Sequence, residues 1–223
     1  SEVEKARKSN RNIIFGMGHH SVAEHAVFNF DIIGVSRLAI EEIEKFRLAS
    51  YTEKSQRYQE LKDNFVIPPE IKGGAFEALF IKTVRMQNEL YHKLYDRLKP
   101  YVFKKHGHLA KEEKHHRTLE GFAKEDARYI VSLAIEGQLG QTINARALEL
   151  LFRRFASHTL AEVREIGQKM YSEVKKIAPS IIIFTRANDY DQKTTKELKT
   201  LASKKLRRVK GQGSREVELQ GFT

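Results

Sequence analysis

One stretch, residues 75–105, constrains the fold of this chain more than any other part of its sequence. Apolar side chains recur there every three or four positions, which is the spacing of one face of an α-helix. These positions are Phe76, Leu79, Phe80, Val84, Leu90, Tyr91, Leu94, Tyr95, Leu98 and Val102. The pattern predicts a long amphipathic helix, and shorter patterns of the same kind predict that helices dominate the fold.

These shorter patterns lie on both sides of the long helix. Helical spacing predicts helices over residues 3–17 and 35–46, over TINARALELLFRRFASH and over LAEVREIGQKMYSEVKKIAP. The stretch AVFNFDIIG instead alternates apolar and polar residues, which is the period of a half-buried strand, and we expect Gly34 to end it. We therefore expect a helix-rich domain with a few strands supplied by the first third of the chain.

The composition excludes several classes of protein. The chain of 223 residues contains no cysteine, which excludes disulfides and thiol catalysis and agrees with a cytoplasmic location. It has no apolar run near 18 residues, about the length that a membrane span needs, so no membrane span is expected. The length suits one large domain, which we place at residues 1–185, followed by a basic C-terminal tail or helix at 186–223. The final GQGSREVELQGFT does not continue the basic pattern, so a displaced fragment is one alternative for it.

The net charge of +11 predicts attraction to polyanions or phosphorylated ligands. Part of the excess lies in residues 191–210, where eight Lys or Arg stand against two acids. Nucleic-acid binding through this segment rests on charge alone and is the least favoured of the functions that we weigh.

The segment KFRLASYTEKSQRY, residues 45–58, concentrates hydrogen-bonding side chains beside two apolar stretches. Arg47, Ser55 and Arg57 can hold a phosphate group through charge-assisted hydrogen bonds, and Glu53 adds a directional contact. A polar turn with local salt bridges is the alternative that the residues alone leave open. The segment is a candidate site for an anionic ligand.

A second candidate lies in the helix expected after residue 142. If Thr142 caps this helix, four residues at four-residue intervals share one of its faces. They are Arg146, Leu150, Arg154 and His158. This stripe either faces an anionic ligand or is an ordinary solvated basic face. Arg128, in the helix expected before it, can join such a site.

Two histidine-rich segments, GHHSVAEH and KKHGHLAKEEKHHR, are candidates for a metal site. Neither matches a zinc spacing with cysteine, and neither is an H-E-x-x-H motif. No metal is predicted.

The chain contains GHHSVAEHAVFNFDIIGVSR, FRLASYTEKSQRY and EDARYIVSLAIEGQLGQTINARALE in this order. Their order and spacing resemble the flavin-dependent thymidylate synthases over residues 16–178. The resemblance implies an α+β fold, a helix-rich domain with a small, mostly antiparallel sheet, and a homotetramer whose active sites lie between subunits. It implies conversion of dUMP to dTMP, with FAD as cofactor and with methylene-tetrahydrofolate and NADPH as co-substrates.

The resemblance also implies roles for individual residues. FAD would contact Ser21, Lys45, Phe46, Arg47, Glu53, Asn144, Arg146 and Leu150. The nucleotide would contact Glu42, Lys45, Glu53, Ser55, Arg57, Arg128 and Arg154. Arg154 would be the catalytic residue, whose guanidinium polarises the uracil ring. Arg153 is the alternative, because the chain is one residue shorter there than the family pattern.

Two departures from the family pattern bear on this function. The family's Arg-His-Arg has become Lys45-Phe46-Arg47, in which Lys keeps the charge without the fork and the Phe ring can still stack on a flavin. Glu41 and Glu42 replace a His-Gln pair, and a carboxylate at Glu42 opposes an anionic ligand unless a cation neutralises it. These changes support an alternative, a non-catalytic or altered-specificity paralogue that binds a nucleotide or pairs with another such domain.

Overall fold

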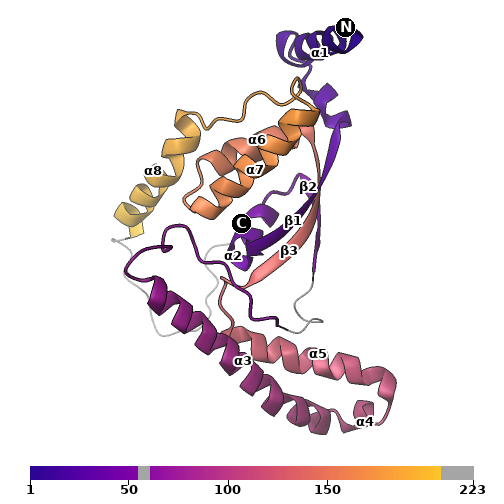
Figure 1. The fold of residues 1–223 in the computed structure, drawn as a ribbon, viewed down its shortest axis with the longest axis vertical. Coiled ribbons are helices and arrows are strands. Elements are labelled where there is room, and N and C mark those ends of the chain that lie inside the picture. The colour runs from indigo at the N-terminus through magenta and orange to yellow at the C-terminus, as the bar shows by residue number, and fades with distance from the viewer. Residues whose placement is uncertain (55–60, 207–223) are drawn as a thin grey trace, which may run out of the picture. The chain divides into compact units, whose positions relative to one another are not determined.

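The structure, a computed structural model, describes residues 1–54 and 61–206. The chain forms two compact units, Ser1–Arg186 and Ala187–Thr223. The first unit contains the helices α1 (Glu2–Arg11), η1 (Asn12–Gly16), η2 (His20–His25), α2 (Arg37–Glu44), α3 (Glu77–Lys105), α4 (Gly107–Ala110), η3 (Glu113–His115), α5 (His116–Ala127), η4 (Arg128–Ile130), α6 (Ala145–Ala156) and α7 (Ala161–Ile177). Its strands are β1 (Val27–Ser36), β2 (Ala49–Glu53) and β3 (Glu136–Asn144) (Figure 1). The second unit contains α8 (Asp189–Leu206), most of whose side chains are exposed.

The three strands form one antiparallel sheet in the order β1-β3-β2. This confirms the predicted α+β class with a small antiparallel sheet. The first third of the chain supplies β1 and β2, as expected, but the central strand β3 comes from residues 136–144 and was not expected. Its inward-facing residues are Leu139, Gln141 and Ile143, so a polar residue interrupts the apolar alternation that would have predicted it.

β1 does not end at Gly34, as its sequence predicts, but continues to Ser36. The pairing with β3 shifts between Ile33 and Val35, and Gly34 lies in this bulge with a φ of 73°. A glycine adopts this left-handed conformation without the steric cost that a side chain brings. The expected helix at 35–46 is shorter for the same reason, since Val35 is in the strand and Ser36 caps α2.

One face of the sheet carries the hydrophobic core. Helices α2, α6 and α7 cover this face (Figure 1), and they contribute Ile40, Ile43, Leu148, Leu151 and Val163 to the core, all 0% exposed. α2 comes so close to the sheet that a Cβ at Gly137 would lie 2.5 Å from Cδ1 of Ile40. The other face of the sheet is lined by exposed polar residues such as Asn29, Ser50, Thr52, Gln138 and Thr142.

The predicted long helix is confirmed as α3, which packs against α5 in a helical hairpin (Figure 1). Val102, Leu119 and Ala123 form the centre of a second, smaller core between them. The Lys- and His-rich connector contains the short helices α4 and η3. Arg128, expected inside a helix, lies in the 3₁₀ turn η4 directly after α5. Among the described residues, no helix combines the length and the apolar character that a bilayer crossing needs.

Candidate functional site

Most of the described residues that the sequence singles out, together with Arg37, fall into three groups in one chain. The Arg146 group contains Ser21, Arg47, Asn144 and Arg146; the Glu42 group contains Glu42, Lys45, Phe46, Arg154 and His158; the Arg37 group contains Arg37, Glu53 and Arg128. Ser55 and Arg57 lie outside the described residues. Different helices and strands position the side chains of each group.

The Arg146 group lies where β3 passes into α6. Asn144 caps α6, because its Oδ1 accepts a hydrogen bond of 2.9 Å from the Ala147 amide. The expected cap, Thr142, is instead in β3, where its hydroxyl donates to Asn29. The competing role of Thr142 in the sheet explains why the cap prediction is wrong.

Arg146 itself is exposed and forms an ion pair with Glu24 of η2. Arg47 is exposed just before β2, whose first residue, Ala49, pairs with Ile143 beside Asn144. Ser21 is exposed on η2, the element that carries Glu24. In the sequence, Glu24 is part of the candidate metal segment GHHSVAEH. In the structure, its carboxylate instead forms an ion pair with Arg146. The group offers two guanidiniums, an amide and a hydroxyl to an anionic ligand.

The Glu42 group joins the end of α2 to the segment after α6. The Glu42 carboxylate accepts a hydrogen bond from Lys45 Nζ at 2.6 Å and lies 3.2 Å from His158 Nε2. The Leu160 amide donates to His158 Nδ1 at 3.1 Å. This bond leaves the hydrogen of the neutral ring on Nε2, which donates to Glu42. Glu42 is therefore held by a cation and by an oriented imidazole.

The hydrogen bond from Lys45 is the largest cause that lowers the pKa of Glu42 below its ordinary value; burial opposes it and the His158 hydrogen bond adds to it. A carboxyl with a lowered folded-state pKa stabilises the fold above its unfolded pKa, about 4.3, and this contribution is lost as pH falls through the lowered value. We expect Glu42→Gln to reduce the free energy of unfolding by at most about 1 kcal/mol near neutral pH. The difference from wild type should close in acid, as measured by urea unfolding across pH.

Glu173→Gln is the matched control for this prediction. Glu173 pairs with Lys176 at the same three-residue spacing and at 2.7 Å, but both side chains are about two-thirds exposed. Solvent screens such a pair, so its variant should show little pH dependence. Equal pH profiles for the two variants would contradict the role assigned to Glu42.

The ring of Phe46 lies against the guanidinium of Arg154. The ring is 5% exposed in the core, and Cζ of Arg154 lies 5.5 Å from its centroid. Because the ring is buried and faces Arg154, direct stacking of Phe46 on a flavin is not supported. The Tyr51 hydroxyl, whose pKa burial raises, lies 2.8 Å from the carbonyls of Ile43 and Phe46 and fixes this turn.

The four residues predicted to share one face of α6 differ in their exposure and position. Arg154 is exposed, Leu150 packs half-buried against the core, and His158 lies beyond the end of the helix. The Nε atom of the neighbouring Arg153 is buried. Arg154 is therefore the more accessible of the two arginines to a ligand.

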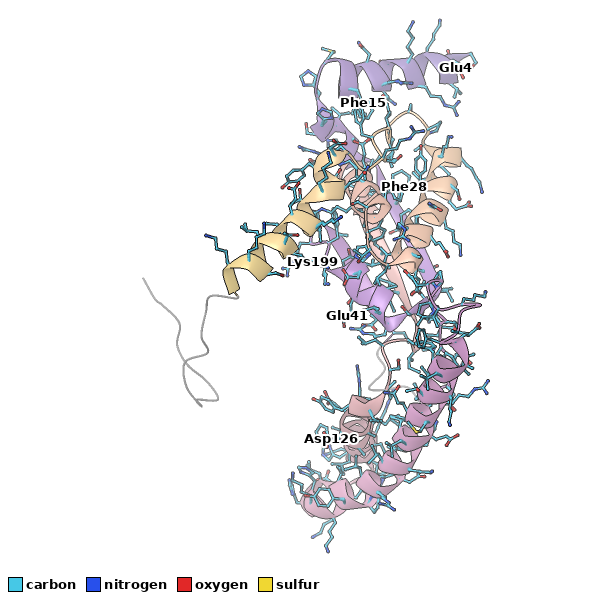
Figure 2. All side chains as sticks on the ribbon, turned by 90° about the vertical axis from the view of Figure 1, so that its left-hand side faces the viewer. Glu4, Phe15, Phe28, Glu41, Asp126 and Lys199 are labelled. Carbon is cyan, nitrogen blue, oxygen red and sulfur yellow. The ribbon has the colours of Figure 1, made fainter. Side chains whose placement is uncertain are left out.

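The Arg37 group lies at the other end of α2. The Arg37 guanidinium donates to Glu53 of β2 and, at 2.6 Å, to Glu41 of α2. Arg37 and Glu41 line a cavity of about 450 Å³ together with Glu125, Arg128, Tyr129, Val131, Ser132 and Leu133. Figure 2 labels Glu41 on α2 and Asp126 near the end of α5, the two helices that flank it. Sequence reasoning quoted Arg37 in a motif but assigned it no role.

Glu53 lines a second cavity, of about 430 Å³. Its other lining residues are Asp31, Ile33, Thr52, Lys54, Gln138, Leu139 and Gly140. Arg37 lines the first cavity and Glu53 lines the second, so the ion pair between them links the two cavities.

The Arg146 and Arg37 groups are at opposite ends of β3. The Arg37 amide donates to the carbonyl of Ile135, the residue before β3, whereas Asn144 ends the strand. At roughly 3.3 Å per residue the strand separates the two groups by roughly 25–30 Å. Within one chain, the predicted site residues that the structure describes do not meet in a single pocket.

Comparisons with known proteins agree on one family. A family model described as thymidylate synthase complementing protein (Thy1) matches residues 1–180. The flavin-dependent thymidylate synthase of Clostridium tetani is 36% identical over 177 residues, 78% of this chain and 68% of its own. That of Pyrococcus abyssi is 33% identical over 169 residues, 73% of this chain and 60% of its own. The chain therefore spans 60–68% of the length of these curated relatives.

A solved structure supports the fold. The crystal structure of the UMP/dUMP methylase PolB from Streptomyces cacaoi bound with 5-Br dUMP superposes with a TM-score of 0.56 at 20% identity, over 80% of this chain and 79% of that chain. Together with a family model that matches most of the chain, these relatives show that the chain belongs to the flavin-dependent thymidylate synthase family.

Proposed function

We propose that this chain forms the subunit of a flavin-dependent thymidylate synthase that converts dUMP to dTMP. Its carbon donor is methylene-tetrahydrofolate and its hydride source is FAD reduced by NADPH. The observation that carries the proposal is the family match over residues 1–180, which encloses all three groups of polar residues. The absence of cysteine agrees with a reaction that needs no thiol nucleophile and with a cytoplasmic location.

The chemistry of the Arg146 group fits a phosphorylated cofactor such as FAD. Arg47 and Arg146 are exposed guanidiniums, which bind phosphate oxygens in a forked geometry. The amide nitrogen of Asn144 and the hydroxyl of Ser21 add neutral donors. Because Glu24 is the acid that contacts Arg146, a bound pyrophosphate can replace it as the partner of this guanidinium.

Bound FAD, once reduced, supplies the hydride, while the protein binds and orients the reactants. Arg154 is the residue that we assign to the uracil ring: its guanidinium stabilises negative charge on the ring while the carbon donor is attacked. The face of Phe46 holds this guanidinium in place. Glu42, which would otherwise repel the nucleotide, is offset by Lys45 and hydrogen-bonded by His158.

The separation of the groups along β3 favours an active site between subunits, as in the homotetramer that we propose. Exposed apolar residues of α3 support further subunit contacts, because Leu79, Met86, Leu90 and Tyr101 fall on one face of the helix and are 40–61% exposed. A second chain would bring an Arg146 group to the Arg37 group of its neighbour.

The test is the reaction itself. The purified chain should carry bound flavin, visible in its absorbance spectrum, and should form dTMP from dUMP only when both methylene-tetrahydrofolate and NADPH are present, as measured by mass spectrometry. Size-exclusion chromatography with light scattering should give four chains per particle. A chain that binds FAD and dUMP without forming dTMP would instead support the non-catalytic paralogue, and one that binds neither would overturn the proposal.

A further inference from the structure

Arg37 is held by its backbone as well as by its side chain. Ser36, its neighbour, is 4% exposed and caps α2, and it donates from its amide and its hydroxyl to Glu162 of α7 at 2.7 and 2.6 Å. The Arg37 amide donates to the Ile135 carbonyl at 2.8 Å. The backbone of Arg37 is therefore held in place by the contact of Ser36 with α7 and by its own hydrogen bond to Ile135.

The guanidinium joins two elements that the chain separates. It donates from Nη1 to Glu53 of β2 and from Nη2 to Glu41 of α2, and its side chain is 19% exposed. Burial lowers the pKa of Arg37, but the hydrogen bonds and charges of Glu53 and Glu41 outweigh this and raise it overall. Arg37 is therefore a positively charged group at neutral pH.

Without the positive charge of Arg37, the Glu53 carboxylate would be repelled by the other negative charges around it. Burial raises the pKa of Glu44, and the charge of Glu53 raises it further, so these two carboxylates interact unfavourably. Asp31 lines the same cavity as Glu53. Bound flavin and nucleotide would add phosphate charges nearby. Arg37 is the counter-charge that lets a carboxylate remain at this position.

We propose that Arg37 is a positioning residue for thymidylate synthesis, which orients and neutralises Glu53 so that Glu53 can contact flavin and nucleotide. This inference rests on the proposed function and adds a residue to it. Arg37 acts through Glu53, which distinguishes it from Arg128, an arginine that lines the same cavity as Arg37 and to which the family resemblance gives a direct contact with the nucleotide.

A double-mutant cycle tests whether the two residues act as one unit. Binding of FAD and of dUMP is measured by fluorescence titration and calorimetry for wild type, Arg37→Met, Glu53→Gln and the double variant. We expect Arg37→Met to weaken binding of at least one ligand by about tenfold or more, as expected for the loss of a charge-assisted contact. The double variant should bind no more weakly than Glu53→Gln alone, and Arg37→Lys should recover part of the loss.

Lys99→Met is the matched control, because Lys99 forms an ion pair of 2.7 Å with Glu120 between α3 and α5, away from Glu53. It should leave both affinities unchanged. Urea unfolding of each variant separates loss of fold from loss of positioning, and Arg37→Lys keeps the test usable if Arg37→Met does not fold. Effects of Arg37→Met and Glu53→Gln that simply add, or an affinity unchanged in Arg37→Met, would overturn the inference while wild-type binding upholds the proposed function. A wild-type chain that binds neither ligand would overturn both.

Discussion

Arg154→Ala is expected to lower kcat for dTMP formation by about 10²–10³-fold, the loss typical of removing one donor that stabilises developing charge. Arg154 is exposed at the end of α6, and its guanidinium lies over the ring of Phe46. Because the side chain adds little to the core, the fold and the binding of FAD should persist. Single-turnover formation of dTMP at saturating dUMP measures the effect, and flavin absorbance with urea unfolding checks that the protein remains loaded and folded.

Arg153→Ala discriminates between the two adjacent arginines. Arg153 is half-buried with its Nε atom inside the protein, so its removal should lower stability more than turnover. Arg154→Lys should fall between wild type and Arg154→Ala, because an ammonium keeps the charge without the planar fork. A larger loss of kcat in a folded Arg153→Ala than in Arg154→Ala would move the catalytic role to Arg153.

The buried Phe46 changes how the altered Arg-His-Arg motif is interpreted. The sequence suggests a lost imidazole and a ring free to stack on flavin. The structure instead has the ring in the core, beneath Arg154 and next to the turn that Tyr51 fixes. The substitution therefore exchanges a ligand contact for support of the arginine that we assign to catalysis. This is compatible with an active enzyme and weakens the argument for a decayed paralogue.

Periodicity predicted the elements whose burial follows one simple pattern. α3 and α7 are long and regular and appear where their sequences indicate, and β1 does so up to the bulge at Gly34. β3 was missed because Gly137, Gly140 and the buried Gln141 interrupt its apolar alternation. No local pattern reports that Gln141 is accepted in the core, where its amide donates to Tyr51.

In the candidate site, too, contacts between neighbours in the sequence could be predicted, whereas contacts between distant residues could not. The Glu42–Lys45 pair lies within one turn and was open to prediction as a neutralised carboxylate. Its second partner, His158, is 116 residues away, and the contact from Glu24 to Arg146 spans 122 residues. From the sequence alone, Arg37 cannot be distinguished from an ordinary surface residue. Its contact with Glu53 exists only because α2 packs beside β2. Family resemblance supplied residue types, whereas the fold supplied their partners.

Ile43→Ala is expected to lower the free energy of unfolding by about 3 kcal/mol, the typical cost of a buried Ile-to-Ala cavity. Ile43 is 0% exposed and lies with Ile40 on the face of α2 that packs against the sheet. The opposite side of the same helix carries Arg37, Glu41, Glu42 and Lys45. A loosened α2 should therefore also weaken FAD and dUMP binding. Urea unfolding at fixed protein concentration, with ligand titrations alongside, measures both effects.

Ile177→Ala provides the matched control, since it makes the same change at the end of helix α7, where the side chain is 76% exposed. It removes the same atoms without leaving a cavity, so the free energy of unfolding should stay within about 0.5 kcal/mol of wild type. Equal losses in the two variants would show that α2 is not held by this core contact. A destabilised Ile43→Ala that binds both ligands with wild-type affinity would mean that the charged residues of α2 do not depend on its packing, and the proposed site would then have to be built from β3 and α6 alone.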